Sequence, residues 1–221
     1  MKKKYLKFFF IIFFLLFTTY TPFDKDNEIL LFPIEKITIE NTRLLSQELI
    51  LIELSEIYNT DLLLYDEKKL NKILRNFKII QGATVKKVFP NTLKIYVKEK
   101  EILAVLVENK KKHLISDDGN LIDINLRKDL KSLPTVFGGK NEFITFYKVL
   151  KKINFSINEI KNFYYFDIGR WDIEINNGNI IKLPVKDYRL SLINYMRISK
   201  NSKFKNYSIF DYRIKDQIIL N

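Results

Sequence analysis

Few residues of this 221-residue chain have the types and spacing that catalysis or metal binding requires. His113 is the only histidine, and no serine or carboxylate is predictably placed to complete a proton relay with it, so we expect it at a strand edge. Asp117 and Asp118 could form an acid/base pair or a metal site, but adjacent aspartates before Gly119 are typical of a turn. Cysteine is absent, which excludes disulfides and thiolate chemistry. With no nucleotide-binding glycine loop or zinc-protease motif either, the sequence predicts no enzyme, no cofactor and no metal.

One glycine-containing stretch allows two interpretations. In GRWDIEINNGNIIKLP, residues 169–184, Gly178 could either admit a phosphate or turn a hairpin. Ile173 and Ile175 alternate with polar residues, which is the period of a half-buried strand. Asparagine and glycine tolerate the positive φ angles of a tight hairpin, so we predict a hairpin here, with Trp171 packing where its first strand begins.

The formal net charge is +12, which raises the question of a nucleic-acid partner. Nucleic-acid binders gather such charge on one face or along one helix. Here four lysines lie at the extreme N-terminus, residues 110–112 form the compact run later on, and the other cations are scattered among carboxylates. This pattern favours a solvated surface that tolerates an anionic membrane nearby, and we predict no nucleic-acid partner.

The N-terminus reads as a membrane anchor. The basic cluster precedes an unbroken apolar block, Phe8–Phe17, and the stretch Tyr5–Phe23 is about 28 Å long as a helix at roughly 1.5 Å per residue. The preceding lysines predict a cytoplasmic N-terminus and a periplasmic bulk, with residues 1–23 as cytoplasmic tip and transmembrane anchor. The alternative is a cleaved signal peptide, which would release a soluble periplasmic binding protein. The stretch Thr18–Pro22 offers no small-x-small cleavage site.

Residues 24–101 predict a first domain with the order β-α-α-β-β. Hydrophobic periodicity and capping residues give a strand around Ile37 and Ile39, one helix from Ser46 to about Tyr58, a second helix from Asp66, and strands at Ile79–Val88 and Thr92–Glu99. We expect both helices on one face of a small sheet. This order resembles a POTRA (polypeptide-transport-associated) domain, and the runs ITIEN and VKKVFPNTLKIYVKEKE carry the resemblance.

Residues 102–221 predict a mixed, mainly antiparallel β-domain with flanking helices, which makes the whole chain α+β. We expect strands around Val105, two strands about the turn at Asp117–Gly119, a helix with Phe143 to Ile153, a strand near Phe163–Ile168, the hairpin, a helix at Lys186–Ser199, and last strands at Tyr207–Ile214 and Gln217–Leu220. With the anchor and the POTRA-like unit, this domain resembles the FtsQ/DivIB family of bacterial cell-division proteins. LISDDGNLID, LPTVFGG, RWDIEINNGNIIKLP and FDYRI carry the match.

The resemblance implies a bitopic inner-membrane scaffold at the division septum that links early and late divisome proteins. It implies binding of FtsB-like and FtsL-like coiled-coil partners by the last strands, contacts of the POTRA-like unit with other membrane division proteins, and contact with the lipid bilayer. An exposed sheet edge can accept an added strand. We therefore predict a partner-binding set of Tyr212, Arg213, Ile214, Lys215, Gln217, Ile218 and Ile219. Because side chains alternate between the two faces of a strand, Ile218 and Leu220 could instead fill the core.

Overall fold

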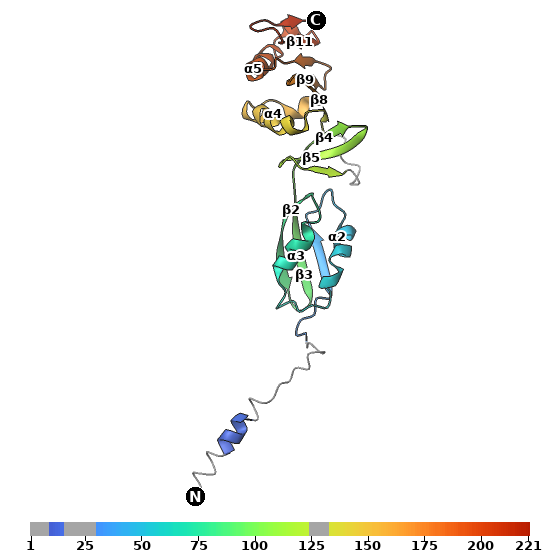
Figure 1. Ribbon diagram of the computed structural model, residues 1–221, viewed down its shortest axis with the longest axis vertical. Coiled ribbons are helices and arrows are strands. Elements are labelled where there is room, and N and C mark those ends of the chain that lie inside the picture. The colour runs from blue at the N-terminus through green and yellow to red at the C-terminus, as the bar shows by residue number, and fades with distance from the viewer. Residues whose placement is uncertain (1–8, 16–29, 124–132) are drawn as a thin grey trace.

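The computed structural model describes residues 9–15, 30–123 and 133–221. Apart from the short segment 9–15, these residues form two units joined end to end (Figure 1). Residues 9–15 are helical. Most of the predicted span, Tyr5–Phe23, lies outside the described residues. Among those that are described, no helix is long and apolar enough to cross a membrane.

The first unit contains a three-stranded sheet in the order β1-β3-β2. The strands β1 (Lys36–Glu40) and β3 (Thr92–Glu99) run parallel, and β2 (Ile80–Val88) runs antiparallel to β3. The alternating burial of β3 follows its sequence, because Leu93, Ile95 and Val97 are buried while the residues between them are not. The predicted strands of this unit are confirmed.

Two helices, α2 (Gln47–Glu53) and α3 (Glu67–Leu74), cover one face of this sheet (Figure 1). Asp66 caps α3, because its carboxylate accepts the backbone N–H of Lys68 at 2.9 Å. The long helix predicted from Ser46 to Tyr58 is wrong in its second half: α2 ends at Glu53, and the 3₁₀ turn η1 (Ser55–Ile57) follows. This turn still buries Ile57 in the core, so the apolar spacing is kept while the helix tightens.

The second unit is built on a nine-stranded sheet in the order β12-β11-β10-β9-β8-β7-β4-β5-β6. Five of its pairings are antiparallel, while β4–β7, β7–β8 and β10–β11 are parallel, so the sheet is mixed and mainly antiparallel as predicted. Its strands are β4 (Ile102–Glu108), β5 (Lys111–Ser116), β6 (Leu121–Asp123), β7 (Thr135–Phe137), β8 (Ile160–Phe166), β9 (Arg170–Ile175), β10 (Ile180–Lys182), β11 (Ile209–Asp211) and β12 (Ile219–Leu220).

Helices α4 (Lys140–Lys152) and α5 (Tyr188–Ile198) pack on one face of the large sheet (Figure 1). Trp171 forms the centre of their core: it is 4% exposed and stacks on Phe146 with ring centroids 4.9 Å apart. The β9–β10 hairpin turns at Gly178, whose φ is 91°, and nothing lies within 4 Å of the place where a Cβ would sit. The predicted hairpin and the packing role of the tryptophan are both confirmed.

The two units share a packed junction. Ile102, Leu114 and Ile122 belong to strands of the large sheet, yet they are buried in the core of the first unit. At the same place the Lys100 ammonium contacts the Asp118 carboxylate at 2.8 Å. The apolar core of the first unit therefore continues beyond residue 101 into the large sheet.

Candidate partner-binding site

The residues whose types best suit catalysis or metal binding, His113, Asp117 and Asp118, have structural roles. The ring of His113 lies 3.0 Å from the carboxylate of Asp123, its register partner on β6. The expectation of a strand-edge histidine without a carboxylate partner is wrong, because β5 is paired on both sides and Asp123 belongs to the neighbouring strand. Among the described residues, no group of three or more histidines, cysteines and carboxylates is placed to hold a metal ion.

Asp117 and Asp118 form a turn, as the sequence predicted. Burial favours the neutral form of Asp118, but hydrogen bonds from Lys100, Ser116 and Asn120 outweigh it and hold the pKa of that carboxyl well below its usual range. A carboxylate that stays ionised and is fully engaged in turn and junction contacts is poorly suited to act as a general base.

The C-terminal strand β12 is the last strand of the large sheet, at the edge opposite β6. Ile209 and Asn221 exchange both backbone hydrogen bonds, at 2.9 and 3.2 Å. In an antiparallel ladder such pairs alternate with pairs that do not bond to each other, and Phe210–Leu220 is the next pair in register. The N–H and C=O of Leu220 therefore point away from β11, toward the free edge.

The last strands are shorter than the sequence predicted. β11 ends at Asp211 rather than Ile214, and β12 begins at Ile219 rather than Gln217. The reason is a local turn: the Asp211 carboxylate accepts the backbone N–H of Arg213 at 3.0 Å, and Asp216 adopts a φ of 57°. The chain bends out of the sheet where alternation alone suggested that it continues.

The predicted partner-binding residues divide into a buried and an exposed set. Tyr212 lies in the core at 7% exposure, and its hydroxyl donates to Asn194 at 3.0 Å. Burial raises the pKa of this phenol far above its usual value. Ile218 is partly buried against the same core, whereas the remaining members of the set are exposed: Arg213, Ile214, Lys215, Gln217 and Ile219.

A groove of about 780 Å³ lies beside the edge strand and brings six of the seven predicted residues together. One wall is the turn from Tyr212 to Ile218, and the other is the start of α5 with the segment before it. Val185 and Leu190 expose 45% and 69% of their surface on that second wall. Sequence reasoning missed these two residues, because nothing in their spacing indicates that α5 faces the last turn.

A row of charges crosses the sheet face opposite the helices and ends at β12. Asp172, Lys182 and Asp211 are register partners on β9, β10 and β11, and Asp211 pairs with Ile219. The guanidinium of Arg213 donates to Oδ2 of Asp211 from Nε at 2.9 Å and from Nη2 at 2.6 Å. The alternation of the hairpin had placed Asp172 on this polar face, but sequence gave no sign that the row would reach the edge strand.

The pKa values of the two carboxylates in this row shift in opposite directions. Burial raises the pKa of Asp172, and the Arg170 guanidinium, 3.2 Å away, only partly opposes it. The pKa of Asp211 is lowered, chiefly by its hydrogen bonds from Arg213, against the effect of burial. Asp211 and Arg213 thus form a fixed charged pair at the entry to the edge strand.

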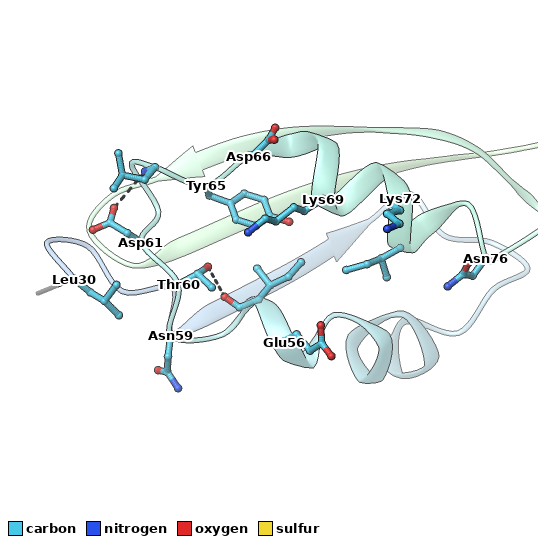
Figure 2. Close-up of a pocket in the computed structure, with 13 residues that line it drawn as sticks. Leu30, Glu56, Asn59, Thr60, Asp61, Tyr65, Asp66, Lys69, Lys72 and Asn76 are labelled. Carbon is cyan, nitrogen blue, oxygen red and sulfur yellow. Dashed lines mark hydrogen bonds between the residues drawn. The ribbon is translucent and has the colours of Figure 1, made fainter. Parts of the chain in front are cut away.

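A second cleft lies in the first unit, between η1 and α3 (Figure 2). Tyr65 is 8% exposed, and its hydroxyl has no hydrogen-bond partner among the described residues. Burial, together with the nearby Asp66 and Glu67, raises the pKa of this hydroxyl to about 12. Three carboxylates and two lysines line the cleft, so it has no single charge preference.

Two family models match the chain, one for each unit. The model described as POTRA domain, FtsQ-type matches residues 32–100. The model described as cell division protein FtsQ/DivIB, C-terminal, matches residues 104–213. The chain belongs to the FtsQ/DivIB family. The FtsQ/DivIB match ends at Arg213, the first exposed residue of the last turn.

Curated FtsQ proteins are similar along most of the chain. The cell division protein FtsQ of Rhizobium meliloti is 25% identical over 190 residues, which cover 84% of this chain and 62% of that protein. FtsQ of Bradyrhizobium diazoefficiens is 27% identical over 195 residues, covering 86% of this chain and 56% of that protein. FtsQ of Rickettsia bellii is 26% identical over 189 residues, covering 84% and 71%. The chain thus spans about three fifths of the length of the first two relatives.

A solved structure with some likeness is the major extracytoplasmic domain of the cell division protein DivIB from Geobacillus stearothermophilus. It is 12% identical, covers 49% of this chain and 98% of its own, and superposes with a TM-score of 0.36. A score at this level adds nothing to the assignment.

Proposed function

We propose that this chain is a single-pass inner-membrane scaffold of the bacterial division machinery with no catalytic role. Membership of the FtsQ/DivIB family supports the division role. The apolar block Phe8–Phe17 behind a lysine cluster supports an anchor within residues 1–23 and a cytoplasmic N-terminus. The POTRA-like unit, residues 24–101, and the β-domain, residues 102–221, then lie on the periplasmic side at the septum.

The scaffold binds its partner by strand addition at β12. The observation that carries this proposal is the position of β12 at the sheet edge, with the backbone N–H and C=O of Leu220 turned outward. An added strand satisfies such groups and gains main-chain hydrogen bonds in a defined register. The partners are a strand-forming segment of an FtsB-like coiled-coil protein and, with it, an FtsL-like protein.

The groove beside the edge supplies side-chain specificity. Ile214 exposes 50% of its surface there, opposite Leu190, so an apolar side chain of the partner can lie between them. Lys215 and Gln217 are exposed at the rim, and Arg213 presents the outer side of its guanidinium. Tyr212 contributes from the core, since its bonds to Asn194 and to the carbonyl of Lys182 fix where the turn begins.

The POTRA-like unit serves a second set of contacts. Its strand β2 is an edge strand of the small sheet, and both described helices of the unit cover the same face of that sheet. Other membrane proteins of the division machinery are the proposed partners of this unit. This second surface and β12 belong to different sheets, so each can be mutated without changing residues of the other.

Two variants of Leu220 test strand addition in the full chain. Leu220→Pro removes the outward N–H, whereas the matched control Leu220→Ala removes the same packed side chain but keeps that donor. We expect Leu220→Ala to co-purify with the FtsB-like protein of the same organism and Leu220→Pro to lose most of the binding, at least about tenfold. Equal binding by the two variants would contradict strand addition.

A chain truncated after Asp216 provides the coarser test. It lacks β12 entirely, and we expect it to fold, as judged by circular dichroism, but not to bind the FtsB-like protein. Retained co-purification of the folded truncated chain would exclude β12 as the site.

Mass spectrometry of the N-terminus tests the anchor independently. The proposal expects an intact start at residue 1 or 2 in the membrane fraction. A mature chain starting near Thr21 would instead show a released periplasmic protein.

A further inference from the structure

Five exposed apolar side chains gather at one end of the first unit. They come from three chain segments: Leu31 (69% exposed), Leu63 and Leu64 (50% and 81%), and Val88 and Phe89 (36% and 50%). We call these five residues the apolar tip. Scattered exposed leucines are ordinary, but apolar side chains that meet from separate segments mark an interaction site.

Specific contacts hold the three segments together. The carboxylate of Asp61 accepts the backbone N–H of Leu31 and of Leu63, each at 2.8 Å. The ammonium of Lys87 donates to the carbonyl of Leu63 at 2.9 Å, which ties β2 to the same loop. The ring of Phe32 meets the ring of Phe89 edge to face, with centroids 4.9 Å apart. The tip is therefore an ordered surface: Leu31 and Leu63 are fixed through their backbone, and their side chains are exposed.

The tip lies where the chain enters the first unit from the N-terminal side. In Figure 2, Leu30 and Asp61 lie together at the end where β1 begins, and in Figure 1 this end is remote from the second unit. The predicted span ends at Phe23, and even a fully extended chain covers at most about 25 Å between there and Leu30. If the anchor spans the membrane, the bilayer surface is within reach of the tip.

The charges beside the tip also suit a membrane. Val88, Thr92 and Lys36 are register neighbours across the sheet, and Lys86 lies in the next row on the same face. Both lysines are exposed. Lysines beside apolar side chains are the combination that binds interfaces with anionic phospholipids. Two carboxylates at this end have hydrogen-bond partners: Glu35 accepts the side-chain amide of Asn91 at 2.6 Å, and Asp61 accepts backbone N–H groups. Burial acts to raise the pKa of Asp61, but these N–H groups hold it below the usual value.

We propose that the apolar tip inserts into the interfacial layer of the phospholipid bilayer and holds the POTRA-like unit against the membrane. The inference rests on the proposed anchor, which brings the tip to the surface. The tip then fixes the direction in which the first unit leaves the membrane, and so the height at which the second unit presents β12.

Tryptophan fluorescence in vesicles with brominated lipids tests this contact. The full chain carries one tryptophan, Trp171, which is 4% exposed and lies in the second unit, so the parent chain gives the background. Leu64→Trp reports from the tip. Leu190→Trp is the matched control, because Leu190 is also a strongly exposed leucine, on α5 of the second unit. The vesicles contain phosphatidylcholine brominated in its acyl chains and phosphatidylglycerol.

We expect bromine to quench the added emission of Leu64→Trp at least about twofold and to leave that of Leu190→Trp unchanged. Leu63→Trp, at a 50% exposed position of the same tip, should behave like Leu64→Trp. Unquenched emission from both tip variants would overturn the proposal. Flotation of the vesicles after a carbonate wash tests the anchor separately. A chain that floats with the vesicles but is not quenched supports the anchor and contradicts insertion of the tip. A chain that is quenched but removed by the wash supports insertion of the tip and contradicts the anchor.

Discussion

The apolar tip and the edge strand β12 expose different physical groups. At the apolar tip the side chains are exposed, and the backbone N–H groups of Leu31 and Leu63 donate to Asp61. At β12 the arrangement is reversed, because Leu220 packs against the core while its backbone N–H and C=O face outward. Exposed apolar side chains suit a fluid surface that imposes no register, whereas an open backbone edge suits a partner strand with a fixed register.

The largest expected effect comes from overpacking the core of the second unit. Gly139, at the start of α4, has a φ of 63°, and a Cβ there would lie 2.5 Å from Cγ of Tyr165 and 2.8 Å from Cη2 of Trp171. We expect Gly139→Ala to cost about 3–5 kcal/mol, because it combines overpacking with backbone strain. Urea unfolding followed by tryptophan fluorescence measures the loss.

The control for that substitution is Gly178→Ala. Gly178 has a φ of 91° but no atom within 4 Å of the new Cβ, so strain alone acts and we expect a loss of about 1 kcal/mol. Gly139→Ala should weaken binding at β12 more than lipid contact of the tip, because the crowded atoms belong to the second unit. Equal losses of stability in the two variants would contradict the crowded packing at Gly139.

A smaller effect distinguishes the charged pair beside β12. The folded-state pKa of Asp211 is lowered by Arg213, so the pair contributes stability that is present above the unfolded value near 3.8 and is lost as the pH falls through the folded value. We expect Arg213→Gln to be less stable than the parent at neutral pH and the difference to vanish in acid. Thermal unfolding between pH 2 and pH 7 measures this.

The matched control is Lys215→Gln, which removes an exposed cation two residues further on. Its stability should follow that of the parent at every pH. A destabilisation by Arg213→Gln that is the same at pH 2 and pH 7 would show that lost packing, not the ion pair, is the cause.

The smallest expected effect concerns the junction between the units. Asp118→Asn removes the carboxylate that contacts Lys100 at 2.8 Å. Because 44% of the Asp118 side chain is exposed, we expect a loss below about 1 kcal/mol. Asp117→Asn, on the neighbouring residue of the same turn, is the control in urea unfolding. A loss of several kcal/mol would show that the bonds from Lys100, Ser116 and Asn120 to this carboxylate contribute far more than an exposed ion pair does.

Local patterns predicted most of the secondary structure. Alternation placed β3 and the β9–β10 hairpin, and the cap at Asp66 placed α3, because these features depend on neighbouring residues. Alternation overestimated the last strands, since the bond from Arg213 back to Asp211 and the turn at Asp216 are set by local hydrogen bonding and φ rather than by hydrophobic period.

The surfaces themselves were less predictable. The edge position of β12 was anticipated from chain order and family resemblance, but the burial of Tyr212 depends on Asn194 of α5, which sequence does not place. The apolar tip joins residues up to 58 positions apart through Asp61 and Lys87, and no periodicity within one segment indicates such a meeting.

Backbone hydrogen exchange at Leu220, measured with and without the FtsB-like partner, tests strand addition most directly. In the free chain the Leu220 amide faces outward and should exchange quickly, whereas that of Ile219 should be slower, because Asp211 and Ile219 form the next bonded pair of the ladder. We predict that the partner slows exchange at Leu220 by at least about tenfold and changes Ile219 less. A stable complex in which the Leu220 amide exchanges as fast as in the free chain would contradict the account.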